Sequence, residues 1–232
     1  MNKSREILWL IWQDPVKRQR YKIGELYKEN EMYYFRYDLE GVKEAKKYNF
    51  ELLPSFSQLN STYENDKMFP VFSTRLPDKR RRNIDEILKK YGLERYDAFE
   101  FLKKNGGKLP IDTLEFVEPI FLSYDFEKIE RKFYVAGTRY YLKESKTNFQ
   151  DLNIKEGFEL KLFQENNNEF DQFAVIVCND QKIKLGYIPR YFSKTVSMAI
   201  EKKYMIECIV DMINLFDFQE CLKVKLIIKK VE

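Results

Sequence analysis

The second half of the chain is built from short β-forming segments separated by turn residues, and this pattern limits the folds available to it. Six strands are predicted, at residues 133–141, 158–164, 174–178, 183–187, 205–212 and 221–229. A single helix is predicted at residues 190–203, where Val196, Ala199 and Ile200 share one face. Several short strands with one helix favour a small, partly closed barrel or a sandwich.

The first half mixes strands with helices. Residues 7–12 are apolar and residues 31–37 are rich in aromatics, so both segments are predicted to be strands. The pattern loosens around residues 110–130, where a charged stretch follows Pro119. We therefore expect an α+β chain of two domains, with residues 1–120 in the first domain and residues 121–232 in the second.

Two helices in the first half have clear boundary signals. Asn83 is placed to cap a helix over residues 84–91, and Gly92 follows its end. Asp97 is placed to cap a second helix, which ends at residues 105–107, Asn-Gly-Gly. These signals predict two short helices in sequence.

The composition excludes several classes of enzyme. The chain contains no histidine, which rules out Ser-His-Asp, Cys-His and His-zinc sites. Its three cysteines, Cys178, Cys208 and Cys221, are widely spaced and form no CxxC pair, so a reducing, cytoplasmic location is expected. No apolar run approaches the roughly 20 residues that span a bilayer, and we expect no membrane association. Neither a metal nor a cofactor is expected.

Any binding of nucleic acid must come from a local patch, because the net charge is only +4. Between residues 133 and 192, aromatic side chains, cations and a carboxylate recur in three blocks, at residues 137–141, 165–171 and 185–190. Aromatics can stack on bases while cations meet phosphates, so these residue types suit holding a nucleic-acid strand. They suit bond-making chemistry poorly.

The three blocks carry a resemblance to a known family. GTRYY at residues 137–141, NNNEFD at 166–171 and LGYIPR at 185–190 occur in the order and spacing of the HIRAN domain. Residues 133–213 resemble this DNA-binding module. The resemblance implies an OB-like β-barrel with one main helix that captures the 3′ end of single-stranded DNA.

The resemblance also implies roles for single residues. Arg139 falls on a phosphate-binding position and Tyr140 on the position that stacks on a terminal base. Phe170 takes the place of a second aromatic. Asp171 falls on the position of the carboxylate that accepts a hydrogen bond from the 3′-hydroxyl. Arg190 falls on another phosphate-binding position.

Further positions complete the predicted DNA-binding set: Tyr141, Asn167, Asn168 and Tyr187. Tyr140 and Tyr141 would point to opposite faces of a strand, which favours Tyr140 as the stacking residue and Tyr141 as a core residue. Asp171 has an alternative role as the cap of a turn. Two positions depart from the family: Phe170 lacks the usual tyrosine hydroxyl, and Gln164 stands where a cation is often found.

The first half resembles the N-terminal subdomain of HipA-type kinases over residues 7–118. The resemblance is carried by GEL at residues 24–26, YFRYD at 34–38, FPVF at 69–72, RLPD at 75–78, Arg82 and LKKNGG at 102–107. It implies a non-catalytic domain, residues 1–120, that contacts a partner protein. A HipA-like kinase, a repressor and a DNA-processing enzyme are the candidate partners.

Two further patterns have ordinary explanations. The basic run at residues 79–82 precedes a helix and is predicted to be a solvated loop rather than a nucleic-acid patch. Asp151, Glu159 and Lys161 imitate the spacing of a metal-dependent nuclease, but so short a pattern arises by chance in a charge-rich chain. The sequence thus predicts a non-catalytic adaptor that binds single-stranded DNA. The alternative is a regulatory protein-interaction subunit of a HipA-type toxin–antitoxin-like system.

Overall fold

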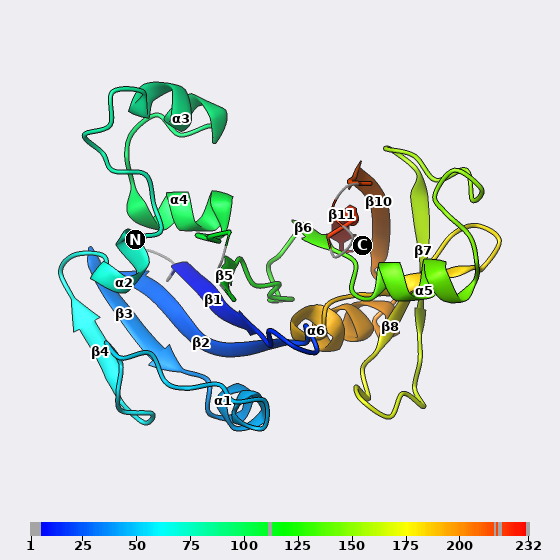
Figure 1. Ribbon diagram of the computed structural model, residues 1–232, viewed down its shortest axis with the longest axis horizontal. Coiled ribbons are helices and arrows are strands. Elements are labelled where there is room, and N and C mark those ends of the chain that lie inside the picture. Colours follow the sequence, from blue (N-terminus) through cyan, green and yellow to red (C-terminus); the bar gives the residue numbers. More distant parts are fainter. Residues whose placement is uncertain (1–5, 111–112, 216, 218–219, 231–232) are drawn as a thin grey trace. The chain divides into compact units, whose positions relative to one another are not determined.

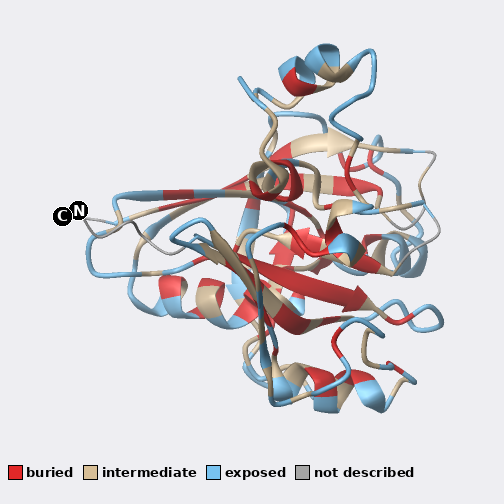
Figure 2. Cartoon of the chain, turned by 90° about the vertical axis from the view of Figure 1, so that its left-hand side faces the viewer, coloured by how far each residue is buried: buried red, intermediate tan, exposed pale blue. Residues whose placement is uncertain are grey.

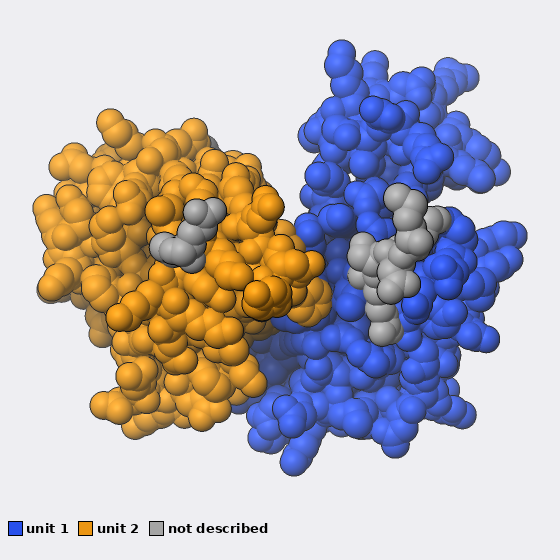
Figure 3. All heavy atoms as spheres, turned by 180° about the vertical axis from the view of Figure 1, so that it is seen from behind, with its two compact units in different colours: residues 1–119 blue, residues 120–232 orange. Residues whose placement is uncertain are grey.

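The computed structural model describes residues 6–110, 113–215, 217 and 220–230. The chain divides into two compact units, residues 1–119 and 120–232 (Figure 3). Each unit contains one sheet and at least two helices, which confirms the predicted α+β class (Figure 1). Buried residues gather on the strands and most loops are exposed (Figure 2). Within the described ranges, every helix is too short or too polar to cross a membrane.

The N-terminal unit is built on a five-stranded antiparallel sheet with the order β4-β3-β2-β1-β5. Its strands are β1 (Glu6–Gln13), β2 (Arg20–Glu29), β3 (Met32–Tyr37), β4 (Thr62–Asn65) and β5 (Leu114–Val117). The strands predicted at residues 7–12 and 31–37 are confirmed as β1 and β3.

Four helices belong to this unit: α1 (Leu39–Lys46), α2 (Pro70–Ser73), α3 (Ile84–Lys90) and α4 (Ala98–Asn105). Helices α3 and α4 confirm the two sequence predictions. Asp97 caps α4 by accepting hydrogen bonds from the backbone of Phe99 at 2.8 Å and Glu100 at 3.1 Å. The predicted cap at Asn83 is wrong, since its side chain makes no capping hydrogen bond and its ψ of 26° departs from the extended conformation of an N-cap.

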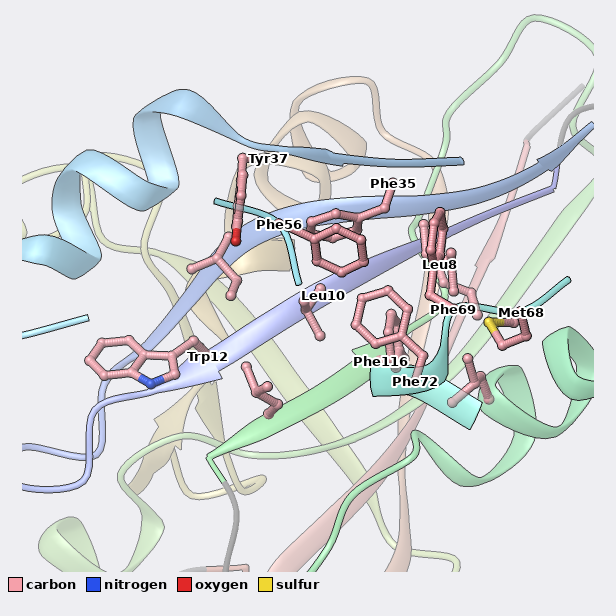
Figure 4. Close-up of a cluster of buried hydrophobic side chains, with 14 of the residues drawn as sticks. Leu8, Leu10, Trp12, Phe35, Tyr37, Phe56, Met68, Phe69, Phe72 and Phe116 are labelled. Atoms are coloured by element: carbon pink, nitrogen blue, oxygen red, sulfur yellow. The ribbon is translucent and has the colours of Figure 1, made fainter. Parts of the chain in front are cut away.

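Aromatic side chains dominate the core of the N-terminal unit (Figure 4). Phe35 and Phe56 are tilted rings 4.3 Å apart, and Phe72 meets Phe116 edge-on at 4.9 Å. These residues come from β3, β5, α2 and the segment before β4, so burying them fastens the helices and strands together.

The C-terminal unit has a six-stranded sheet with the order β6-β11-β10-β7-β8-β9. Its strands are β6 (Lys128–Tyr134), β7 (Glu159–Gln164), β8 (Val175–Cys178), β9 (Lys184–Tyr187), β10 (Met205–Ile213) and β11 (Leu222–Lys229). The main helix, α6 (Arg190–Glu201), follows β9 and agrees with the predicted helix. A shorter helix, α5 (Thr138–Glu144), follows β6.

The curled sheet is closed between its first and last strands. Just beyond β6, Ala136 exchanges two backbone hydrogen bonds with Tyr187 of β9, at 2.8 and 2.9 Å. Gly186 makes this approach possible: a Cβ atom built on it would lie 2.3 Å from the carbonyl oxygen of Ala136, and its φ is +148°. The close approach of the two backbones therefore explains why the LGYIPR block has a glycine at position 186.

The strand predicted at residues 133–141 is wrong beyond its first residues. Gly137 adopts a left-handed φ of 79°, which turns the chain out of β6 and starts helix α5. Thr138 is buried, and its hydroxyl donates to the carbonyl of Val135 at 3.3 Å. The two tyrosines of GTRYY thus lie side by side on a helix and not on opposite faces of a strand.

Candidate nucleic-acid interface

Five polar and aromatic side chains converge where α5 meets β9, and we call them the tyrosine–lysine cluster. Its members are Tyr141 of α5, Glu165 and Asn168 of the loop after β7, and Lys184 and Tyr187 of β9. Three of them, Tyr141, Asn168 and Tyr187, were predicted from the sequence. The barrel closure described above holds β9 beside the segment that leads into α5.

Hydrogen bonds join the members of this cluster. The Tyr187 hydroxyl donates to Glu165 Oε2 at 2.5 Å, and Lys184 donates to the same hydroxyl. Asn168 Nδ2 donates to Glu165 at 2.6 Å and to the Tyr187 hydroxyl at 3.2 Å. Lys184 Nζ also pairs with Glu165 Oε1 at 3.4 Å. Glu165 is therefore the acceptor that ties the asparagine-rich loop to β9.

Aromatic contacts extend the cluster to α5. The Lys184 ammonium lies 4.6 Å from the centre of the Tyr141 ring and 4.1 Å from that of Tyr187. The two rings meet edge-on at 5.7 Å. Tyr141 is half-buried in this arrangement, so its predicted place in the core is wrong. The error follows from the helix that replaces the predicted strand.

The ionisation of the cluster follows from these contacts. Burial raises the pKa of Glu165, but the hydrogen bonds from Tyr187 and Asn168 and the charge of Lys184 outweigh it, so this pKa lies below its usual range. Burial and the bond to Glu165 together hold the pKa of Tyr187 well above its usual range. At neutral pH the cluster thus contains a carboxylate and a neutral phenol.

A depression of about 510 Å³ lies beside the cluster. Its lining consists of Tyr140, Tyr141, Glu144, Ser145, Ile183 and Lys184. Tyr140 is 63% exposed and meets Tyr141 edge-on at 5.1 Å. An exposed aromatic beside a lysine offers a stacking surface next to a cation.

The asparagine-rich loop is ordered by its own polar side chains. Asn168 Oδ1 accepts hydrogen bonds from the backbone of Phe170 at 2.9 Å and Asp171 at 3.0 Å. Asp171 Oδ1 accepts from the backbone of Phe173 at 2.9 Å, which is the turn-capping role that the sequence left open. Phe170 is 75% exposed at the tip of this loop.

The other predicted site residues are exposed. Arg139 lies on α5, Asn167 on the loop and Arg190 at the first position of α6. Among the hydrogen bonds, ion pairs and ring contacts described for the tyrosine–lysine cluster, none involves Arg139, Asn167 or Arg190. Their predicted roles remain predictions.

Gln164 has a structural task in place of the family's cation. Its Nε2 donates to Ser197 Oγ at 2.7 Å and to Glu201 at 3.1 Å, both on α6. The side chain thus fastens β7 to α6.

The two patterns with ordinary explanations also have structural partners. Residues 79–82 are exposed, and Arg80 pairs with Asp78 at 2.9 Å. Glu159 pairs with Lys161 at 2.7 Å, while Asp151 accepts a hydrogen bond from the backbone of Asn148 at 3.2 Å. Within the described ranges, no three acidic or cysteine side chains are grouped so as to hold a metal ion.

Sequence reasoning missed Glu165 and Lys184. Glu165 is the first residue of the block at residues 165–171, directly before the asparagines, and Lys184 directly precedes LGYIPR. Opposite charges flanking two blocks were the available signal. Only the pairing of β7, β8 and β9 shows that the two side chains meet.

Tyr187→Phe should lower the free energy of unfolding of the C-terminal unit by about 1–2 kcal/mol, because Lys184 and Asn168 lose a half-buried acceptor. Hydrogen exchange of the β8 and β9 amides measures the change. Tyr140→Phe is the matched control, since it removes a tyrosine hydroxyl from an exposed side chain. Equal protection of β9 in the two variants would contradict this account of the cluster.

Parts of the chain are similar to known protein families and structures. The HIRAN domain model matches residues 130–214, and the HipA N-terminal domain model matches residues 15–110. A crystal structure of a protein from Lactobacillus plantarum is 21% identical over 46% of this chain and 94% of its own, with a TM-score of 0.34. The HIRAN domain of human HLTF is 17% identical over 47% of this chain and 84% of its own, with a TM-score of 0.36. No curated protein matches the chain.

Both family matches confirm the resemblances seen in the sequence blocks. The sheet order and the main helix of the C-terminal unit agree with the expected OB-like barrel. Residues 15–110 of the chain therefore match the family of the HipA N-terminal domain, and residues 130–214 match that of the HIRAN domain.

Proposed function

We propose that the HIRAN domain of this chain binds single-stranded DNA and prefers a free 3′-hydroxyl end. The observation that carries the proposal is a pair of exposed aromatic side chains, Tyr140 and Phe170, on the two segments that the tyrosine–lysine cluster holds together. Aromatic side chains this exposed gain little from folding. Stacking on unpaired bases is the role that we propose for both side chains.

Cations around these aromatics suit the DNA backbone. Lys184 lines the depression next to Tyr140, and Arg139 lies one residue earlier on the same helix. Arg190 is the first residue of α6, a 12-residue helix whose N-terminal end favours an anion. Two or three such contacts would give a site of modest affinity that weakens with added salt.

Asp171 is the proposed reader of the 3′-hydroxyl. One oxygen of its carboxylate holds the turn at Phe173. The other oxygen has no hydrogen-bond partner in the described part of the chain, so it can accept from a hydroxyl. The same negative charge would repel a terminal phosphate.

Wild-type protein should bind a strand that ends in a 3′-hydroxyl about tenfold more tightly than the same strand with a 3′-phosphate, since a hydrogen bond to a charged group contributes about 1.5–3 kcal/mol. Fluorescence anisotropy with labelled strands measures both affinities. Asp171→Asn should remove the preference, because an amide can still accept from Phe173 but carries no charge.

Asp180→Asn is the matched control, as it neutralises an exposed aspartate in the turn between β8 and β9. Equal wild-type affinity for the two ends would refute end recognition. An absence of binding to either strand would refute the DNA-binding proposal as a whole.

We further propose that residues 1–120 contact a partner protein and that residues 121–232 bind the DNA, with neither domain catalytic. The match of residues 15–110 to the HipA N-terminal domain supports the first role. It also supports the second candidate, a regulatory subunit that binds a HipA-like kinase or a repressor. If the chain is such a regulatory subunit, Arg139→Ala and Phe170→Ala should leave its biological function intact. If its function is to retain DNA, the same substitutions should abolish that function.

A further inference from the structure

The outer face of β6 and β11 carries a concentration of lysines, which we call the lysine ladder. Its members are Lys128 and Lys132 of β6 and Lys223, Lys225 and Lys229 of β11. They alternate along the strands with buried side chains such as Phe133, Val224 and Leu226. Side chains two residues apart in a strand point to the same face, so the lysines share the outer surface of the barrel.

The register places like charges directly opposite each other. Lys225 is the cross-strand partner of Lys132, and Lys229 is that of Lys128. Directly opposed like charges destabilise a sheet. Lysines on an unpaired edge strand can prevent aggregation, but β11 lies between β6 and β10, so edge protection does not explain its three lysines.

The ladder is only partly neutralised. Lys132 pairs with Asp211 at 2.7 Å, Lys128 with Glu130 at 3.3 Å, and Lys229 with Glu207 at 2.9 Å. Lys223 Nζ instead lies 5.6 Å from the centre of the Tyr134 ring. Neither Lys223 nor Lys225 forms an ion pair among the residues that the structure describes, although, beside the hydrogen bond from Lys229, the charge of Lys225 helps to lower the pKa of Glu207.

Lys223 and Lys225 lie at the end of the ladder nearest α5. Lys223 is opposite Tyr134, the last residue of β6, and α5 begins four residues further along the chain. Side chains two residues apart on one strand are about 6.7 Å apart, so Lys223 and Lys225 can meet different phosphates of one strand. The ladder therefore leads away from the helix that carries Arg139 and Tyr140.

We propose that the lysine ladder contacts the phosphate backbone of single-stranded DNA beyond its terminal nucleotide. This inference rests on the proposed DNA binding and extends it from the end of the strand to its interior. A polyanion explains why positive charge is concentrated on one barrel face of a chain whose net charge is only +4. The contact would be independent of base sequence.

A circular single-stranded oligonucleotide tests the ladder separately, because it has no end for the aromatic site to capture. Wild-type protein should bind this circle in a salt-dependent manner. The double variant Lys223→Gln/Lys225→Gln should bind it about tenfold more weakly at low salt, and the slope of log affinity against log salt should fall by about 1.4. The control variant Lys155→Gln/Lys161→Gln removes the same charge from exposed positions near and on β7.

A linear strand of the same sequence with a 3′-hydroxyl distinguishes this inference from end recognition. If the ladder acts as proposed, the Lys223→Gln/Lys225→Gln variant loses affinity for the linear strand and for the circle by the same factor. It also keeps any preference for a 3′-hydroxyl end. If end recognition fails, the circle still reports on the ladder. Failure of the wild type to bind the circle, or equal loss in the ladder and control variants, would overturn the inference.

Discussion

Gly186→Ala should destabilise the C-terminal unit by about 3 kcal/mol or more, the largest effect expected for any single substitution considered. The new methyl group would lie 2.3 Å from the carbonyl oxygen of Ala136 and 2.8 Å from the Val135 side chain. Relieving this overlap requires the strand to move, and overpacking alone costs about 1–3 kcal/mol. A φ of +148° adds backbone strain for any residue with a Cβ atom.

Gly157→Ala is the matched control for this prediction. Gly157 also has a positive φ, +82°, but a Cβ atom there would meet nothing within 4 Å. Its substitution should therefore cost only the backbone strain, about 1–2 kcal/mol. Urea unfolding combined with hydrogen exchange of the β9 amides separates the two variants. Similar losses in both would mean that the contact with Ala136 matters little.

The double variant Tyr140→Ala/Phe170→Ala should lower the affinity for single-stranded DNA about a hundredfold. Stacking of a base on an aromatic side chain contributes about 1–3 kcal/mol, and the proposed function assigns one base to each ring. Both side chains are largely exposed, so their removal should leave the fold intact. Anisotropy titration with a labelled strand measures the affinity, and circular dichroism checks the fold.

Tyr124→Ala/Phe163→Ala supplies the comparison, because it removes two other exposed aromatics from the same unit. Tyr124 lies before β6 and Phe163 on β7, outside the proposed stacking surface. This control should bind DNA as the wild type does. An equal loss in both double variants would point to general contacts of exposed aromatics, and no loss in either would remove stacking from the mechanism.

The fold could be predicted where local pattern and tertiary environment agree. Helix α4 was predictable because Asp97 and Gly106 fix both of its ends. Strand β2 was missed, since its polar and apolar residues do not alternate regularly: Gly24 interrupts the pattern and β1 shifts register beside it. Helix α5 was missed because its tyrosines favour a strand. Only the left-handed turn at Gly137 directs the chain into a helix instead.

The candidate site was partly predictable for a similar reason. Its blocks could be found from the sequence, and they supplied Tyr141, Asn168 and Tyr187 of the tyrosine–lysine cluster. Glu165 and Lys184 lie 19 residues apart and meet only through the register of β7, β8 and β9. The sequence shows opposite charges at the edges of two blocks, but it contains no local sign that these two charges pair across strands.

Closure of the barrel has a consequence for how a ligand and the fold influence each other. Two backbone hydrogen bonds between Ala136 and Tyr187 join the segment leading into α5 to β9. We call this pairing the seam of the barrel. A DNA strand held by Tyr140 on one side and by the asparagine-rich loop on the other would reinforce the seam from outside. By mass action, such a ligand stabilises the closed barrel over any opened form. The seam and the site are then thermodynamically linked, so loosening one weakens the other.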